Sequence, residues 1–317
     1  MLSVLEAANL LRSLDRVLIL THVRPDGDTV GCAAALCAGL RSLGKTAYLL
    51  PNPGLTDTTA PYFAPYAAPE EFVPDHVVST DIATVGLFPD NALPYADRVE
   101  LAIDHHPSFT HFGKANIVRP EAAACGELIY DLLAALGPIT AEMALPLYVA
   151  VSTDTGCFVY ANTTPHTHRV AAGLMEQGID FKRLNKKHFR TKSVARMRLE
   201  SLLLQGLYLC HDNTVAVATL SLDVMAKAGA TNDDTEDIAA FVGQLEGLRH
   251  SATIRELKRG ECKISMRTNA DYLDACAVCA HLGGGGHKAA AGCTVMGSVE
   301  EAKAAILQAI DQELNRK

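Results

Sequence analysis

The stretch RVLILTHVRPDGDTVG, residues 16–31, decides the fold that this sequence adopts. It opens with the apolar run VLIL, which is typical of a short buried strand. The polar segment 22–28 follows, and the alanine-rich segment 32–44 then has the composition of a helix that ends at glycine. A second apolar run, KTAYLLP at 45–51, predicts the next strand. This order of strand, loop, helix and strand predicts a parallel crossover unit.

Similar apolar runs continue through the first half of the chain. HVVSTD (76–81) and RVELAIDHH (98–106) predict further buried strands, whereas CGELIYDLLAALG (125–137) and TAEMALPLYVAVSTDTG (140–156) predict helices. We therefore expect an N-terminal α/β domain over residues 1–185, with an open, mostly parallel sheet flanked by helices.

The composition changes after this domain. Residues 182–198 are basic and poor in large apolar side chains, so we expect a hinge here, with a linker helix over 186–200. Beyond it, alternating apolar and polar residues predict half-buried strands, and the segment 298–317 predicts an amphipathic closing helix. The second domain is expected to be a smaller α+β unit over 201–317.

Length and charge limit the classes of function. The chain has 317 residues, 49% of them apolar, which is enough for two domains with substantial cores. Its formal net charge of -8 argues against a protein that binds long duplex nucleic acid through a basic surface. A small anionic ligand in a local pocket remains compatible with this charge.

The nine cysteines lie in apolar stretches such as GCAAALCAGL (31–40), which is typical of small buried hydrophobic residues. The N-terminal segment lacks the pattern of a secretory signal, and no apolar run of about 18 residues predicts a membrane span. We therefore expect a cytoplasmic protein that does not enter a membrane.

His22, Asp26 and Asp28 follow the first predicted strand directly. Ligands of open α/β sheets bind at the carboxyl ends of the strands. The spacing of Asp26 and Asp28 in a turn lets their carboxylates point towards two different ions. A polar turn is the alternative, because aspartate and glycine after proline are common turn formers. This cluster alone does not decide between the two interpretations.

The ends of other predicted elements carry the same kinds of side chain. Asp81 alone would be a cap or turn residue, but the whole set is too concentrated for independent turn roles. The further members are Asp81, Asp104, His105, His106 and Asp154. Carboxylate oxygen with imidazole nitrogen suits Mn²⁺ or Mg²⁺. Two such ions clamp the attacking and leaving oxygens of a phosphoryl displacement, so the set predicts a metal-dependent phosphoesterase.

The second domain contains GGGGHKAAAG at residues 283–292. Glycines let backbone N–H groups approach an anion, and His287 and Lys288 follow them directly. The segment is not a P-loop, because the required Gly-Lys-Ser/Thr is missing. Arg267 could supply a planar fork for phosphate. An anion site is therefore expected, with a flexible turn as the alternative.

Two other patterns are assigned to structure. CAVC at 276–279 has the spacing of a zinc half-site, but no second pair follows and the surrounding helix is apolar, so we expect core residues. The basic run 182–198 is interpreted as a solvated linker face.

The ordered motifs resemble the DHH phosphoesterase family with a DHHA1 second domain, over nearly the whole chain. They are HVRPDGD (22–28), Asp81, DHH (104–106), STDTG (152–156) and GGGGHKAAAG (283–292). Length and second domain resemble the family's oligoribonucleases and 3′-phosphoadenosine-5′-phosphate (pAp) phosphatases.

The resemblance implies two divalent ions, Mn²⁺ or Mg²⁺. Their implied ligands are His22 and Asp26 on one ion, Asp28, His105 and Asp154 on the other, and Asp81 on both. It further implies that His106 contacts the scissile phosphate and donates a proton to the leaving oxygen, and that Asp104 orients the histidines. A metal-activated hydroxide is the implied nucleophile. The implied substrate contacts of the second domain are Arg267, Gly285, Gly286 and His287.

The implied activity is hydrolysis of short oligoribonucleotides and pAp to mononucleotides. The implied partners are small nucleotides and short single-stranded RNA, and a homodimer stays open. Hydrolysis of linear or cyclic dinucleotides such as pApA and c-di-AMP, a RecJ-like single-strand exonuclease and a silent nucleotide sensor are alternatives. The filled ligand set disfavours the sensor. Length and charge disfavour the exonuclease, and the glycine–histidine motif disfavours a pyrophosphatase.

Overall fold

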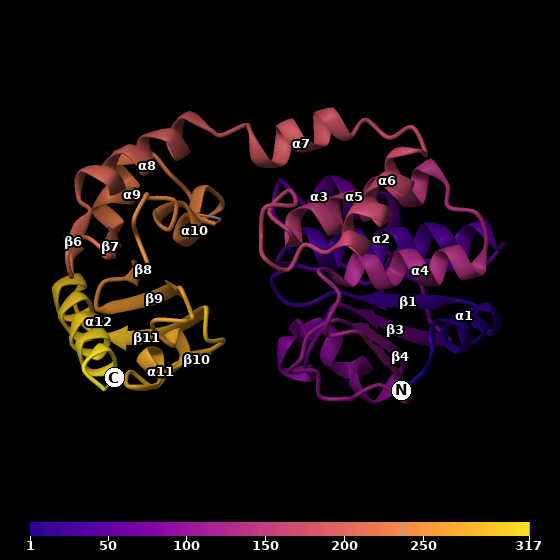
Figure 1. The fold of residues 1–317 in the computed structure, drawn as a ribbon. Coiled ribbons are helices and arrows are strands. Elements are labelled where there is room, and N and C mark those ends of the chain that lie inside the picture. Colours follow the sequence, from indigo (N-terminus) through magenta and orange to yellow (C-terminus); the bar gives the residue numbers. More distant parts are fainter. Residues whose placement is uncertain (236, 317) are drawn as a thin grey trace. The chain divides into compact units, whose positions relative to one another are not determined.

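The computed structural model describes residues 1–235 and 237–316 and divides into two compact units, 1–191 and 192–317. Each unit has one sheet (Figure 1). Each unit also has its own hydrophobic core. Two helices share the segment that we expected to form one linker helix. They are α7 (Phe181–Phe189) and α8 (Val194–Gln205), with residues 190–193 outside both.

The sheet of the first unit is parallel throughout, which confirms the predicted fold class. Its strand order is β2-β1-β3-β4-β5. The strands are β1 (Val17–Leu20), β2 (Ala47–Leu49), β3 (His76–Thr80), β4 (Val99–Asp104) and β5 (Ala115–Val118). The short edge strand β5 was not predicted, because its sequence ANIV is only partly apolar and only Ile117 in it is buried.

Helices cover one face of this sheet. They are α1 (Val4–Ser13), α2 (Gly27–Ser42), α3 (Ala60–Phe63), α4 (Cys125–Leu136), α5 (Ala141–Asp154) and α6 (Pro165–Met175). Because side chains alternate along a strand, Val17 and Ile19 of β1 join the helical core. Leu18 and Leu20 enter a smaller cluster on the other face, which short 3₁₀ segments around Phe88 cover.

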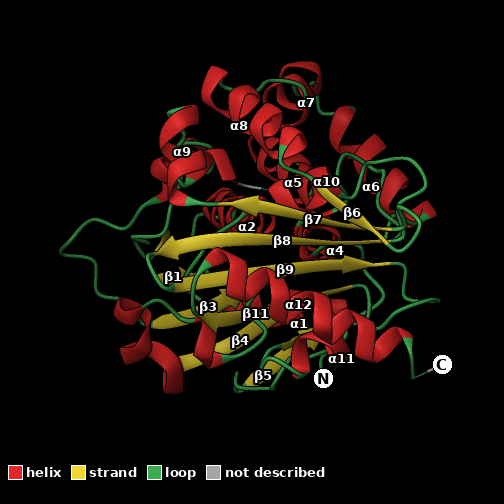
Figure 2. Cartoon of the chain, turned by 90° about the vertical axis from the view of Figure 1, so that its left-hand side faces the viewer, coloured by secondary structure: helices red, strands yellow, loops and turns green. Residues whose placement is uncertain are grey.

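The sheet of the second unit is mixed, in the order β10-β11-β9-β8-β7-β6. The strands are β6 (Tyr208–Cys210), β7 (Val215–Leu220), β8 (His250–Lys258), β9 (Glu261–Thr268), β10 (Gly285–Gly286) and β11 (Ala290–Met296). Of the strand pairs described in this second sheet, only β7–β8 is parallel. Figure 2 shows β8 and β9 as long neighbouring strands.

Helices cover both faces of the second sheet. The cluster on one face includes α8 with α9 (Leu222–Ala228) and α10 (Ile238–Val242), and that on the other includes α11 (Ala275–Ala280) and α12 (Val299–Leu314). Cys279 is buried in the second cluster and Cys276 packs against it, so the prediction that CAVC belongs to the core is confirmed.

The glycine run differs from the loop that the sequence predicted. Gly285 and Gly286 form β10, which pairs with Ala291 and Gly292 of β11. The reason is a tight reversal at His287, whose backbone N–H donates to the Ala290 carbonyl at 2.8 Å.

Among the described helices, none is long and apolar enough to cross a membrane.

Close approach of α2 to α5 depends on Gly31. A Cβ atom at this position would lie 2.3 Å from the Pro146 carbonyl oxygen and 2.8 Å from the Ala150 Cβ. We predict that Gly31→Ala forces the two helices apart and lowers the free energy of unfolding by about 2–3 kcal/mol. The thermal unfolding midpoint of the first unit measures this loss.

Gly137, which follows α4, provides the matched control. A Cβ atom there would have nothing within 4 Å, and its backbone at φ 170° is extended. Gly137→Ala should therefore change the free energy of unfolding by less than about 0.5 kcal/mol. Equal midpoints for the two alanine variants would show that α2 and α5 do not need the glycine.

Candidate metal centre

The candidate site lies at the carboxyl edge of the first sheet. Because β1, β3 and β4 are parallel, the residues that follow them meet at this edge. The last residue of α5, Asp154, reaches the same place. A cavity of about 250 Å³, here called the edge cavity, is lined by His22, Val23, Arg24, Asp26, Asp81, Leu87, His105, His106 and Asp154.

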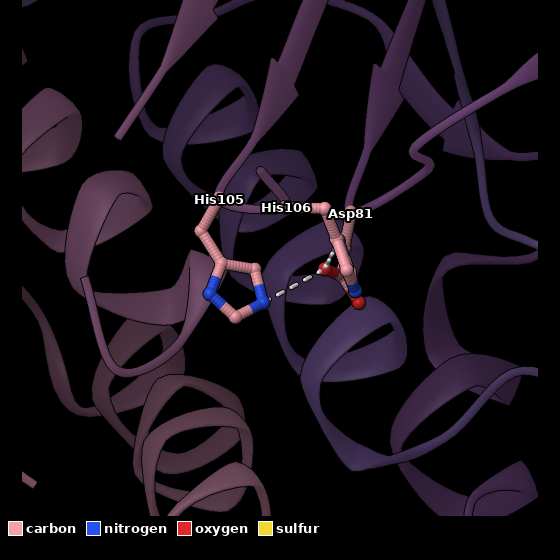
Figure 3. A group of neighbouring side chains, drawn as sticks. All are labelled: Asp81, His105 and His106. Carbon is pink, nitrogen blue, oxygen red and sulfur yellow. Dashed lines mark ion pairs between the residues drawn. The ribbon is translucent and has the colours of Figure 1, made fainter. Parts of the chain in front are cut away.

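Asp81 forms ion pairs with the two adjacent histidines that follow β4, which Figure 3 marks with dashed lines. Its Oδ1 lies 3.6 Å from His105 Nε2 and 3.6 Å from His106 Nδ1. Its other oxygen, Oδ2, lies 3.8 Å from His22 Nε2. These separations are too long for hydrogen bonds and leave room for an ion between the ligand atoms.

The donor atoms form three groups in which all atoms lie within 4.8 Å of one another. Asp81 belongs to two of the groups, once with His22 and Asp26 and once with the two histidines that follow β4. The third group contains Asp28, His105 and Asp154. His105 Nε2 is 3.7 Å from an oxygen of Asp28 and 3.7 Å from one of Asp154. The structure thus brings every predicted ligand into one cluster.

Asp81 is a buried residue with a strained backbone conformation. It is 3% exposed, its backbone has a φ of 58°, and its N–H donates to the Ile103 carbonyl at 2.8 Å. A non-glycine residue in this region costs of order 1–3 kcal/mol and persists only where surrounding contacts impose it. Its buried Oδ1 has no hydrogen-bond partner among the described residues. Burial, and then the charge of Asp28, raise the pKa of Asp81 well above its usual range.

Asp28 is held from behind by the start of α4. The backbone N–H groups of Cys125 and Gly126 donate to its two oxygens at 2.7 and 3.0 Å, and the Cys32 thiol donates at 3.2 Å. Burial, followed by the charge of Asp26, raises the pKa of Asp28 to about 7. Sequence reasoning missed these three donors. Only Cys32, one helical turn after Asp28, left a signal in its spacing.

Asp104 forms hydrogen bonds with both adjacent histidines. It is fully buried, and its Oδ1 accepts from the backbone N–H groups of His105 and His106 at 2.6 and 3.0 Å. The same oxygen lies 2.7 Å from His106 Nδ1, and this hydrogen bond raises the pKa of His106. His105 Nδ1 lies 3.1 Å from the Ala122 carbonyl oxygen, so we assign its proton to Nδ1. Nε2 is then free to face the carboxylates.

Asp26 and Asp154 complete the cluster. The Oδ1 of Asp26 accepts from the backbone N–H groups of Asp28 and Thr29 at 3.0 and 3.1 Å, so it also caps α2. Burial, followed by the charge of Asp28, raises the pKa of Asp154 to about 7. Asn162 donates to the Asp154 carbonyl oxygen at 3.1 Å and to that of Ala123 at 2.9 Å, which ties the following loop to this edge.

These residues fit divalent cations. Three neighbouring carboxyl groups have raised pKa values, which shows an excess of negative charge in a poorly solvated place. The buried Oδ1 of Asp81 lacks a donor among the described residues. The three groups offer oxygen and imidazole nitrogen without thiolate, which suits hard and borderline ions.

The second unit contains a separate cavity of about 240 Å³, here called the arginine cavity. It is lined by Gly243, Leu248, Arg249, His250, Ser251, Arg267, Thr268 and Asn269. Of the predicted substrate contacts, only Arg267 lines it. Gly285 and Gly286 lie on β10, His287 lies in the following turn, and all three are exposed. The lining of the arginine cavity therefore includes one of the four predicted contacts of this unit.

A parallel α/β unit with carboxylates and imidazoles at its carboxyl edge, followed by a smaller mixed-sheet unit, defines the class of two-domain DHH-type phosphoesterases. A model of the DHH family, N-terminal domain, matches residues 16–151, and a model of the DHHA1 domain matches residues 212–316. The chain belongs to the DHH–DHHA1 family.

Relatives span most of the chain. It is 33% identical over 95% of its length to a Thermus thermophilus protein named bifunctional oligoribonuclease and PAP phosphatase NrnA, and covers 90% of that protein. A Bacillus subtilis protein of the same name is 25% identical over 89% of this chain and 90% of its own.

Solved structures share the fold. The crystal structure of an exopolyphosphatase-related protein from Bacteroides fragilis has a TM-score of 0.87 at 24% identity, with coverage of 98% of this chain and 96% of that one. RecJ from Thermus thermophilus in complex with Mn²⁺ has a TM-score of 0.55 at 17% identity, with 99% of this chain and 55% of that chain covered.

The raised carboxyl pKa values predict how metal removal changes stability. Between their ordinary pKa near 4 and the value of about 7, Asp28 and Asp154 keep their protons when folded and lose them when unfolded. The free energy of unfolding of the metal-free protein should therefore fall as the pH rises from about 4 to about 7. Thermal unfolding after chelation measures this decline.

Divalent ions bind the ionised carboxylates and should cancel the decline. Saturating Mn²⁺ should thus raise the unfolding midpoint by several degrees more at about pH 8 than at about pH 6. Asp28→Asn provides the matched comparison, because it removes one titrating group of similar shape. A larger stabilisation by Mn²⁺ at the lower pH would contradict the assignment of these carboxylates as ligands.

Proposed function

We propose that this protein hydrolyses short oligoribonucleotides and pAp to mononucleotides as a metal-dependent phosphoesterase. The observation that carries the proposal is the cluster of three donor groups at the edge of the first sheet, two of which contain Asp81. The names of the Thermus thermophilus and Bacillus subtilis relatives support the substrate class. The free and mostly buried cysteines support a reducing, cytoplasmic location.

We assign the donor groups to two divalent ions, with Mn²⁺ as the first candidate. His22, Asp26 and Asp81 would hold one ion, and Asp28, His105 and Asp154 the other, with Asp81 shared. When bound, such ions act as Lewis acids on a phosphoryl group and lower the pKa of a water molecule.

His106 is the proposed proton donor to the leaving oxygen. Its Nδ1 is engaged by the Asp104 carboxylate at 2.7 Å, so Nε2 is available to the edge cavity. The same hydrogen bond raises the pKa of His106, which keeps a proton on the ring at a higher pH than usual. Asp104 acts through this histidine by fixing its orientation and by stabilising its charged form.

The second unit is proposed to bind the part of the substrate that does not react. Arg267 lines the arginine cavity and offers a planar fork for phosphate. The exposed backbone of Gly285 and Gly286, with the neighbouring His287, is proposed to contact the sugar or the terminal phosphate. A small nucleotide held at a local site, rather than a long nucleic acid, suits a chain with a net charge of -8.

Product analysis tests the substrate class. Purified protein with Mn²⁺ is offered pAp, RNAs from dinucleotide to pentanucleotide, the linear dinucleotide pApA and pyrophosphate. We expect AMP from pAp together with mononucleotides from the RNAs. Hydrolysis of pApA alone would favour a dinucleotide phosphodiesterase. Hydrolysis of pyrophosphate alone, or of none of the four, would contradict the proposed substrates.

Asp81→Asn tests the metal assignment. Asparagine has nearly the same shape as aspartate and tolerates a positive φ, so the fold should survive. We expect the rate on pAp to fall by at least about 100-fold, because stabilisation by metal ions is worth several kcal/mol. Initial rates with saturating Mn²⁺ measure the loss.

Asp97→Asn is the control, since Asp97 is an exposed aspartate of the first unit that does not line the edge cavity. It should retain the wild-type rate. Circular dichroism of both variants checks the fold. A folded Asp81→Asn protein with the wild-type rate would exclude Asp81 as a shared ligand.

A further inference from the structure

Arg24 occupies an unusual place in the edge cavity. The polar side chains that line this cavity are otherwise aspartates and histidines, and Arg24 is its only Lys or Arg among the described residues. It stands in the loop between β1 and α2, two residues from His22 and two from Asp26. Neither the predicted ligand set nor the proposed proton donor includes this residue.

The backbone on both sides of Arg24 is fixed. The Val23 N–H donates to the Leu87 carbonyl at 2.7 Å, and Asn52 donates to the His22 carbonyl at 2.8 Å. On the other side, Pro25 is buried and Asp26 caps α2. The loop therefore holds the Cα of Arg24 in place without help from its side chain.

The guanidinium itself has no partner among the described residues. The Arg24 residue is exposed, and no hydrogen bond, ion pair or ring contact joins its side chain to another described group. Several other arginines of this unit have partners. Arg12 donates to the Ala135 carbonyl, Arg41 to that of Ala47, and Arg119 pairs with Asp131. No contact with the described residues therefore gives the Arg24 charge a structural role.

The neighbouring carboxylates do not explain the charge either. Asp26, Asp81 and Asp154 lie within the donor groups, and none of them forms an ion pair with Arg24 within 4.0 Å. A cation that lines a cavity of metal-binding groups without contacting them is placed for a ligand that enters the cavity. The planar guanidinium fork matches two oxygens of one phosphate, and it is weakly hydrated and permanently charged.

We propose that Arg24 binds the non-bridging oxygens of the scissile phosphate of the substrate. This inference rests on the proposed phosphoesterase function and adds a contact made by the chain itself. Arg24 holds the reacting phosphate in the edge cavity and offsets part of its charge, while the donor groups keep their ligand role. Because every substrate of the reaction contains that phosphate, the contact serves pAp and RNA alike.

Binding of inorganic phosphate to the Mn²⁺-loaded protein tests the contact without turnover. Isothermal titration should show that Arg24→Gln raises the dissociation constant of phosphate by about 10- to 100-fold, the usual range for a lost charged hydrogen-bond donor. Arg24→Lys should restore part of the affinity, since it keeps the charge but loses the fork. Separate titrations with Mn²⁺ should give the wild-type metal affinity for both variants.

Arg169→Gln is the matched control. Arg169 is an exposed arginine of α6 in the same unit, and it does not line the edge cavity. Its loss should leave phosphate affinity unchanged. Equal phosphate affinity for Arg24→Gln and the wild type would overturn the proposal. Loss of Mn²⁺ binding in Arg24→Gln would also overturn it, because the residue would then organise the metal loop.

Kinetics separate this proposal from the proposed function. In Arg24→Gln, kcat/KM should fall by a similar factor on pAp and on a dinucleotide RNA, because both present a scissile phosphate. A fall on only one of them would overturn the assignment to that phosphate. If the wild type hydrolyses neither substrate yet binds phosphate through Arg24, the substrate class fails and the phosphate contact stands.

Discussion

The burial of neighbouring carboxylates at one edge of the first sheet is the constraint on which the site depends. Asp28, Asp81 and Asp104 are nearly or fully buried, where ionised groups are costly to hold. The chain offsets part of this cost with donors, such as the start of α4 behind Asp28 and the backbone N–H groups at Asp104. The remaining imbalance appears as raised pKa values of Asp28 and Asp81. A site with this imbalance is prepared for cations.

The parallel topology brings these groups together despite their separation in sequence. Strands β1, β3 and β4 end at one edge, and α2 begins there because it follows β1 directly. The start of α4 comes to the same edge and donates two backbone N–H groups to Asp28. A helix N-terminus favours a nearby negative charge. Gly31 lets α5 pack closely against α2, and α5 carries Asp154.

The sequence was sufficient to predict the parallel sheet and the grouping of the aspartates and histidines, because apolar runs with polar ends follow from simple periodicity. It was insufficient where contacts join distant segments. The donors Cys125 and Gly126 lie far from Asp28 in the chain and carry no distinctive side-chain chemistry. The pairing of Gly285 and Gly286 with β11 depends on a reversal at His287 that a glycine-rich sequence does not reveal. Arg24 was overlooked because an arginine before Pro-Asp resembles an ordinary polar loop residue.

Structural and functional roles are combined in the same side chains at this edge. Asp26 caps α2 through one oxygen, and that oxygen also lies 3.7 Å from His22 Nε2 within a donor group. A capping aspartate is fixed in direction by two backbone N–H groups, so it needs little reorganisation to meet an ion. The interpretation of this segment as a polar turn and its interpretation as a metal site are therefore compatible. The helix cap fixes the position of the Asp26 carboxylate, and the neighbouring donor atoms make this carboxylate a candidate metal ligand.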